Sequence, residues 1–166
     1  FKTTESGDKG QFLGADPTFV QYDEALITNL KLNYKVVFSG SEAATITAFQ
    51  QATKNQTPLL GYFYDPQWLH SEIELVKIDL PAYTAGCDAD LKKVACDYPA
   101  YTLNKIARTK WLEGAGDAGT LVKNFSWSNA DQNSVADSIT NKNLKELDAA
   151  KVWLDANAAI WQKWMP

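Results

Sequence analysis

The order of helical and strand-like segments predicts an α/β fold with a largely parallel sheet. A helical pattern from residue 16, a β-branched segment at 34–38, a second helical pattern from residue 39 and an apolar strand at 58–64 follow one another along the chain. Such alternation is typical of parallel strands that are joined by helices. A length of 166 residues with 45% hydrophobic content allows one ordinary domain or two small lobes.

The N-terminal segment is expected to be a loop that leads into a helix. Residues 1–15 carry glycines and charges around one apolar pair, Phe12-Leu13. The helix should begin with Asp16 as its N-cap and Pro17 at its first helical position, which are favoured residues for these places. Its backbone N–H groups would then point out of a helix N-terminus, a natural seat for a carboxylate.

A strand and a second helix are predicted next. Tyr34–Phe38 is aromatic and β-branched, which favours a short strand. The spacing of Ser39 and Glu42 matches a capping box, which opens a helix that should end at residues 54–56.

Residues 58–70 form the most distinctive stretch of the chain. An unbroken apolar run between Pro58 and Asp65 has the length and punctuation of a strand that is buried on both faces. Core packing is the simpler interpretation of any single ring, but several rings at a strand end favour a ligand-binding edge. This edge carries Tyr62, Phe63, Tyr64, Trp68 and the only histidine, His70.

The second half is predicted to change from strands to helices. Leu75–Leu80 alternates and indicates a strand, and Tyr101–Ala107 indicates another. A cap at Ser128 or Asn129 would open a helix, and the last helix should run from Lys145 to Trp164. The buried stripe expected on this last helix is Leu147, Ala150, Leu154, Ala158 and Trp161.

Composition excludes several classes of function. The net charge is -4 and Arg108 is the only arginine, which disfavours nucleic acid as a partner. No apolar run approaches the roughly 20 residues that cross a bilayer, and the N-terminal residues do not match a signal peptide. Because the chain starts without methionine, we expect a processed protein or a fragment of a longer one.

The two cysteines indicate a disulfide rather than a metal site. Zinc needs about four ligands, and one histidine with Cys87 and Cys96 does not supply them, so we expect neither metal nor cofactor. The alternatives are a disulfide across a short polar loop or two thiols. The disulfide is favoured, and it would indicate an oxidising compartment outside the cytoplasm.

One glycine-rich motif raises the possibility of a nucleotide enzyme. Residues Gly114–Gly119 match G-x-G-x-x-G, but Thr109–Glu113 separates them from any predicted strand, so a loop between helices is favoured. No nucleophile lies in a recognisable catalytic motif, and the sequence therefore favours a binding protein over an enzyme. A third interpretation is an interaction module that grips a partner protein through exposed tryptophans.

Two motifs resemble the substrate-binding proteins of ABC transporters for glycine betaine, proline betaine and choline. These motifs are Gly14–Tyr22, with its Asp-Pro-Thr-Phe core, and Gly61–Trp68, with an aromatic-x-Pro-x-Trp turn. The segment Leu144–Trp164 resembles the closing helix of that family. The resemblance implies a periplasmic-binding-protein-like (type II) two-lobe α/β architecture, incomplete at the N-terminus. Residues 1–81 would form most of the second lobe, 82–96 an inter-lobe loop with the disulfide, and 97–166 the C-terminal part of the first lobe.

The resemblance also implies a binding site for a small zwitterionic or cationic quaternary amine. Phe19 and Tyr64 would form walls of an aromatic cage around the ammonium, and the backbone amides of Val20 and Gln21 would hold a carboxylate. Trp68 and His70 complete the expected set. The protein would be periplasmic or extracellular and would deliver its ligand to an ABC transporter permease. A homodimer through the incomplete lobe is also expected, because a lobe that lacks strands exposes apolar surface.

Overall fold

The computed structural model describes residues 1–19 and 21–166, which divide into two compact units. Unit 1 comprises residues 1–64 and 75–100, and unit 2 comprises residues 65–74 and 101–166. Residues 82–96 therefore lie within unit 1. Their predicted role as a link between two lobes stays a prediction.

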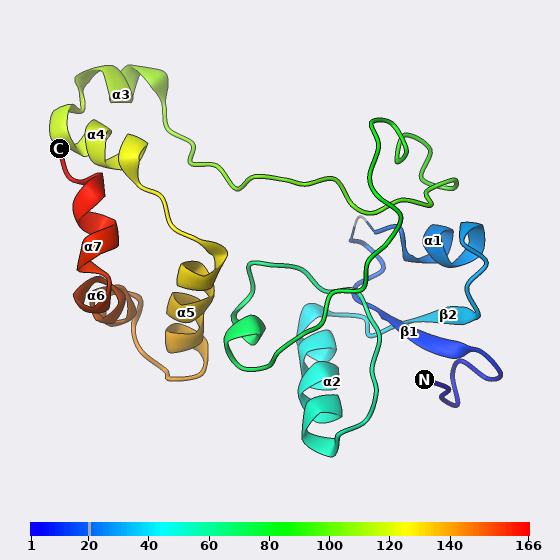
Figure 1. Cartoon of the computed structure of the whole chain (residues 1–166). Coiled ribbons are helices and arrows are strands. Elements are labelled where there is room, and N and C mark those ends of the chain that lie inside the picture. The colour runs from blue at the N-terminus through cyan, green and yellow to red at the C-terminus, as the bar shows by residue number, and fades with distance from the viewer. Residues whose placement is uncertain (20) are drawn as a thin grey trace. The chain divides into compact units, whose positions relative to one another are not determined.

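The sheet of unit 1 pairs two parallel strands, β1 (Gly10–Gly14) and β2 (Tyr34–Phe38), which lie side by side in Figure 1. β2 has the bounds that the sequence predicts. β1 replaces the loop expected at residues 1–15, and this prediction was wrong because glycine at both ends hides the strand pattern. A side chain at position 10 would place its Cβ 2.6 Å from Cε1 of Tyr34, so the strand needs glycine where that ring covers it.

The predicted strand at 58–64 contracts to a single bridge at Gly61. The Leu13 N–H donates to the Leu60 carbonyl at 2.8 Å, and the Tyr62 N–H donates to the Leu13 carbonyl at 3.0 Å. A Cβ at position 61 would lie 2.7 Å from the Leu13 oxygen. Only a glycine can approach β1 this closely, so the pairing with β1 is limited to Gly61. The prediction of a strand over residues 58–64 was therefore wrong.

The first helix, α1 (Asp23–Asn29), begins six residues after the predicted first helical position, Pro17. Asp16 Oδ1 accepts hydrogen bonds from the Thr18 N–H at 2.8 Å and its hydroxyl at 2.7 Å, and the Phe19 N–H donates to the Asp16 carbonyl. These bonds close a local turn in which the aspartate serves the backbone two residues on. The prediction of a helix N-terminus at Asp16 was therefore wrong.

The second helix, α2 (Glu42–Asn55), ends where the sequence predicts. Its N-cap is Ser41, whose hydroxyl accepts the Ala44 N–H at 3.2 Å. Ser39 was the predicted cap, but its hydroxyl shares a hydrogen bond with that of Thr45 at 2.6 Å. The capping signal was thus read two residues early.

The strands predicted at 75–80 and 101–107 do not form. The first segment alternates in sequence, yet its Val76 is exposed, and Ile106 of the second segment is 97% exposed. Among the described residues no strand offers either segment a ladder of backbone hydrogen bonds. Alternation marks a segment that can join a sheet, but a strand needs a partner.

Unit 2 is helical. The 3₁₀ turn η1 (Trp68–Ser71) packs against α5, which also packs against α6. Its other elements are α3 (Thr109–Gly114), α4 (Gly116–Asn124), α5 (Asn129–Thr140), α6 (Glu146–Ala156), α7 (Ala158–Trp161) and η2 (Gln162–Trp164).

Two predictions for the helices of unit 2 concern their ends. Ser128 caps α5 as predicted, because its hydroxyl accepts the Asp131 N–H while the Asp131 carboxylate accepts the Ser128 N–H. The glycine motif at 114–119 was expected to be a loop between helices, but Gly114 ends α3, residues 116–119 begin α4, and only Ala115 separates the two helices. The motif is a helix junction, and the prediction of a loop was wrong.

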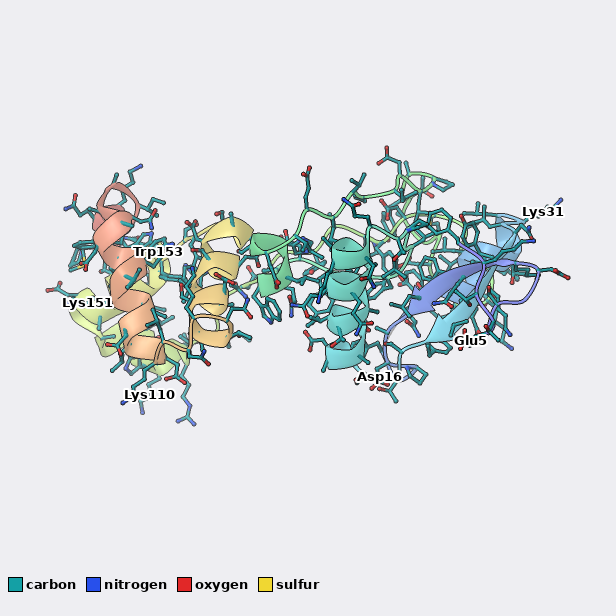
Figure 2. All side chains as sticks on the ribbon, turned by 90° about the horizontal axis from the view of Figure 1, so that it is seen from below. Glu5, Asp16, Lys31, Lys110, Lys151 and Trp153 are labelled. Carbon is teal, nitrogen blue, oxygen red and sulfur yellow. A yellow bond between two sulfur atoms is a disulfide. The ribbon has the colours of Figure 1, made fainter. Side chains whose placement is uncertain are left out.

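The C-terminal helix is interrupted at Asn157, whose Nδ2 donates to the Trp153 carbonyl at 2.8 Å. The predicted buried stripe was wrong, since Leu147 is 85% exposed whereas Trp153 and Trp164 are buried. These two rings stack with centroids 5.6 Å apart. Figure 2 shows Trp153 on the side of α6 toward α5, and its Nε1 donates to Asp131 of α5. Because the indole N–H of Trp153 has a hydrogen-bond partner, the ring can be buried, and tryptophan rather than leucine fills the core.

Candidate functional site

A cleft of about 400 Å³ lies in unit 1 at the start of α1. The turn after Asp16 and the first residues of α1 form one side of it, with Phe38 at the end of β2. Leu91 and Lys92 complete the wall. They belong to the loop that the Cys87–Cys96 disulfide closes, called here the disulfide loop. A second hollow beside α2 contains none of the predicted site residues. The cleft at α1 is therefore the candidate site.

Phe19 and Gln21, two of the predicted site residues, both line this cleft. The Phe19 side chain is exposed, so its ring face is available to a ligand. The Gln21 side-chain oxygen, Oε1, is buried and has no hydrogen-bond partner. Val20, which the resemblance assigns to the same site, lies outside the described residues.

Asp23 contributes a buried carboxyl group to the same wall, and it is only 3% exposed. Its Oδ1 accepts a hydrogen bond from the Tyr98 hydroxyl at 3.4 Å, while its Oδ2 has no partner. The pKa of Asp23 is raised to about 6, chiefly by burial and in smaller part by the charge of Glu24, while the Tyr98 hydrogen bond lowers it. The sequence analysis did not identify Asp23 as a site residue, because an aspartate in a first helical turn has an ordinary explanation.

Tyr98 connects the disulfide loop to the start of α1, and it too was missed. Its ring stacks on Tyr22 with centroids 4.6 Å apart, and its hydroxyl accepts the Tyr22 N–H at 3.0 Å. Burial raises the pKa of Tyr98 above its ordinary value. The ring centroid of Tyr62 lies 5.8 Å from that of Tyr98 and 6.5 Å from that of Tyr64. A row of rings therefore runs from α1 to Tyr64, the predicted cage residue. No local signal in the sequence brings Tyr98 to α1.

Tyr64 lies in unit 1 with its hydroxyl donating to Glu42 Oε1 and its ring stacked on Phe63. It is half-buried and does not belong to the described lining of the cleft that holds Phe19. The structure thus places the two predicted cage walls in one unit but not in one cleft.

Trp68 and His70 belong to unit 2, where η1 carries them on either side of the fully buried Leu69. The preceding Asp65 is anchored to α5, since its carboxylate accepts from Asn133 Nδ2 at 2.9 Å and Asn129 Nδ2 at 2.7 Å. Burial opposes ionisation of Asp65, but these bonds and nearby His70 hold its pKa below the usual value. The structure does not bring Trp68 and His70 into the same unit as Phe19 and Gln21.

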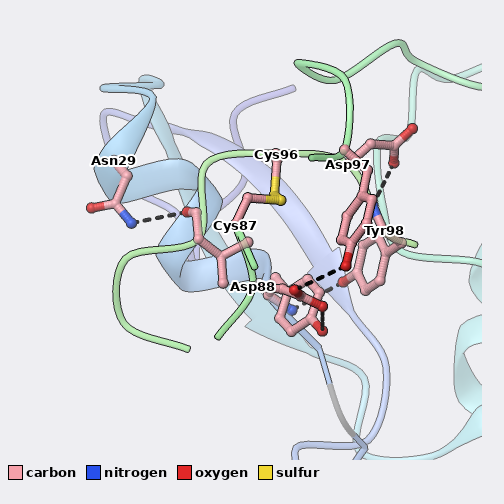
Figure 3. The surroundings of a disulfide bond; sticks show 9 residues. Asn29, Cys87, Asp88, Cys96, Asp97 and Tyr98 are labelled. Carbon is pink, nitrogen blue, oxygen red and sulfur yellow. Dashed lines mark hydrogen bonds between the residues drawn. A yellow bond between two sulfur atoms is a disulfide. The ribbon is translucent and has the colours of Figure 1, made fainter. Parts of the chain in front are cut away.

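The disulfide between Cys87 and Cys96 is present, which confirms the favoured alternative. The loop that it closes buries Val94 completely against α1. Asn29 Nδ2 on α1 donates to the Lys92 and Val94 carbonyls at 3.1 and 2.9 Å, and Figure 3 shows this side of the loop. The disulfide loop therefore holds part of the cleft wall in place.

The described residues contain neither a candidate membrane span nor a candidate metal site. No described helix combines the length and apolarity that a membrane span requires. No group of three or more metal-ligating side chains gathers in the part of the chain that the structure describes.

Comparison with known families settles the relationship that the motifs suggest. The family described as the substrate-binding domain of ABC-type glycine betaine transport systems matches residues 2–156. The chain belongs to this family. Its predicted family resemblance is thereby confirmed.

Two relatives are named for the solutes that they bind. The chain is 28% identical over 167 residues to the trimethylamine N-oxide-binding protein of Pelagibacter ubique, covering 97% of this chain and 52% of that protein. It is 25% identical over 126 residues to the glycine betaine/carnitine transport binding protein of Listeria monocytogenes, covering 76% of this chain and 38% of that protein. The chain thus spans about half or less of the length of these relatives.

Two solved structures share the fold. A choline-binding protein of an ABC transporter in complex with choline aligns with a TM-score of 0.50 and 17% identity, over 95% of this chain and 57% of that one. A glycine betaine/L-proline-binding protein from Borrelia burgdorferi aligns with a TM-score of 0.56 and 18% identity, over 95% and 56%. The periplasmic-binding-protein-like (type II) fold class is confirmed.

Proposed function

We propose that this chain is the solute-binding component of an ABC importer that captures a small quaternary amine outside the cytoplasm. The observation that carries the proposal is the family match, which extends over almost the whole chain. Relatives that bind trimethylamine N-oxide, glycine betaine or carnitine support this ligand class. In this role the chain binds and releases its ligand without catalysis.

The cleft at α1 is the proposed seat of the ligand. The exposed Phe19 ring offers a π face to the ammonium group, a contact worth about 0.5 to 2 kcal/mol. Gln21 lies beside it and supplies polar groups. On the strength of the family motifs alone, Tyr64, Trp68, His70 and the Val20 amide stay proposed as ligand-binding residues, with no position relative to this cleft assigned to them.

The proposed partners follow from the transport role. A permease would receive the ligand, and the disulfide supports a location in an oxidising compartment. Exposed apolar residues such as Leu103 and Ile106 support the proposed homodimer. The lobe assignment of residues 1–81, 82–96 and 97–166 belongs to the same proposal.

Calorimetric titration with glycine betaine, choline and trimethylamine N-oxide tests the function. At least one of these should bind and raise the melting temperature, because a ligand specific for the native state stabilises it. Phe19→Ala should weaken binding by roughly 3- to 30-fold, in line with the loss of one cation–π contact. Trp111→Ala removes another exposed aromatic ring, from unit 2, and serves as the control. Absence of binding by every amine, or stabilisation by a nucleotide instead, would overturn the proposal.

A further inference from the structure

Two residues that line the cleft each carry a buried oxygen acceptor that no described group satisfies. These atoms are Oε1 of Gln21 and Oδ2 of Asp23, two residues apart in the sequence. Buried polar atoms are nearly always paired, and an unpaired charged oxygen is the most costly kind. A ligand that brings a positive charge or a donor would remove this cost.

We propose that the cleft selects cationic amines over zwitterionic ones, with Asp23 as the counter-charge and Gln21 as an acceptor for a donor group on the ligand. This inference rests on the proposed function and narrows its ligand class. A ligand such as an amino alcohol would place its ammonium near Phe19 and direct its hydroxyl toward Asp23 or Gln21. A ligand carboxylate in the same position would meet like charge.

The charges around Asp23 favour this selection. The Asp23 carboxyl faces the Tyr98 hydroxyl, Glu24 follows it on α1, and neighbouring Tyr22 bonds Asp88 through its own hydroxyl. Lys92 is the cation in the described wall, but its side chain is exposed and solvated. A buried charge acts through a low local dielectric, whereas an exposed one is screened by water and salt. The field of Asp23 therefore dominates inside the cleft.

The inference predicts opposite pH dependences for two matched ligands. The pKa of about 6 means that Asp23 is neutral below that pH and charged above it. Choline affinity should rise as the pH increases through about 6, because charging Asp23 creates the counter-charge. Glycine betaine affinity should fall over the same range, since its own carboxylate stays ionised there.

Choline and glycine betaine share a trimethylammonium group and differ only in bearing a hydroxymethyl group or a carboxylate. At about pH 8 the full chain should bind choline at least tenfold more tightly, which corresponds to about 1.4 kcal/mol. Asp23→Asn keeps the shape of the side chain and removes its charge. In this variant the preference should shrink to about threefold or less, and the pH dependence near 6 should disappear.

Asp148→Asn is the matched control, because Asp148 also lies in the first turn of a helix but in unit 2. It should keep both the preference and the pH dependence. Binding of both ligands with equal affinity at high pH, unchanged in Asp23→Asn, would overturn the inference and leave the proposed function standing. Binding of neither ligand by the parent protein would overturn both. If Asp23→Asn fails to fold, the opposite pH slopes of the parent protein decide the matter.

Discussion

The ring of Tyr98 stacks on the ring of Tyr22, with centroids 4.6 Å apart, and so joins the end of the disulfide loop to the start of α1. The Tyr98 hydroxyl accepts the Tyr22 N–H and donates to Asp23, which couples the same contact to the cleft wall. Two residues that lie 76 positions apart in the sequence thereby set the geometry of the candidate site.

Removing the Tyr98 hydroxyl should destabilise the protein while keeping the ring. Tyr98→Phe leaves the Tyr22 N–H and Asp23 Oδ1 without this partner, at a cost of about 1 to 3 kcal/mol. Tyr101→Phe is the control, because the Tyr101 hydroxyl also makes a hydrogen bond, to the Asp65 carbonyl, but at the exposed surface. Denaturant titration of both variants makes the comparison, and equal losses would show that burial of the Tyr98 bond has no special value.

The stability of the protein should depend on the charge of Asp23. A carboxyl with a folded-state pKa of about 6, above its ordinary value of 3.8, is stabilising in its neutral form. Its contribution is present below about pH 4 and is lost as the pH rises through about 6. Asp23→Asn, which is never charged, should therefore gain stability relative to the parent between about pH 4.5 and pH 8, by roughly 1 to 3 kcal/mol.

Other carboxylates give the stability of the protein the opposite pH dependence. Asp65, Asp97, Asp131 and Asp137 have lowered pKa values, and the stability that they contribute is lost as the pH falls below about 4. For this reason the test compares the variant with the parent at each pH instead of following the parent alone. A difference that stays constant across the range would contradict the assignment for Asp23.

Loss of the disulfide should affect both stability and binding. Replacing Cys87 and Cys96 by serine removes a covalent loop closure worth about 2 to 3 kcal/mol for a loop of this length. The same loop supplies Leu91 and Lys92 to the cleft, so ligand affinity should fall as well. A reductant should destabilise the parent to the same extent and leave the double variant unchanged. Destabilisation of the double variant by reductant would exclude this explanation.

The sequence predicts elements well where local chemistry decides them. The bounds of β2, the end of α2 and the Ser128 cap all follow from nearby residues. The predictions failed where distant partners decide. Leu75–Leu80 lacks a described strand to pair with, and the Asp16 side chain bonds its own turn instead of starting a helix.

The candidate site shows the same limit. Phe19 and Gln21 were found through a motif of adjacent residues, and the cleft does contain them. Asp23 was not predicted as a wall residue, because its burial depends on Tyr98 and on the disulfide loop. Periodicity in one segment carries no information about such contacts.

The aromatic core of unit 2 allows a sharp test of the corrected C-terminal packing. Trp153 is 6% exposed, stacks on Trp164 and lies 5.7 Å from Trp127, and its Nε1 donates to Asp131. Trp153→Ala should therefore cost about 3 to 5 kcal/mol. Leu147→Ala, at a position that the sequence predicted to be buried, should cost less than about 0.5 kcal/mol because the side chain is exposed.

All six tryptophans lie at positions assigned to unit 2, so tryptophan fluorescence during denaturation follows the unfolding of this unit. Trp153→Ala should lower the transition midpoint seen by this probe, and Leu147→Ala should leave it in place. The predicted stripe of Leu147, Ala150 and Leu154 would give the reverse order. The sign of the difference between the two midpoints therefore shows whether Trp153 or the Leu147 stripe is buried. No absolute free energy of unfolding is needed.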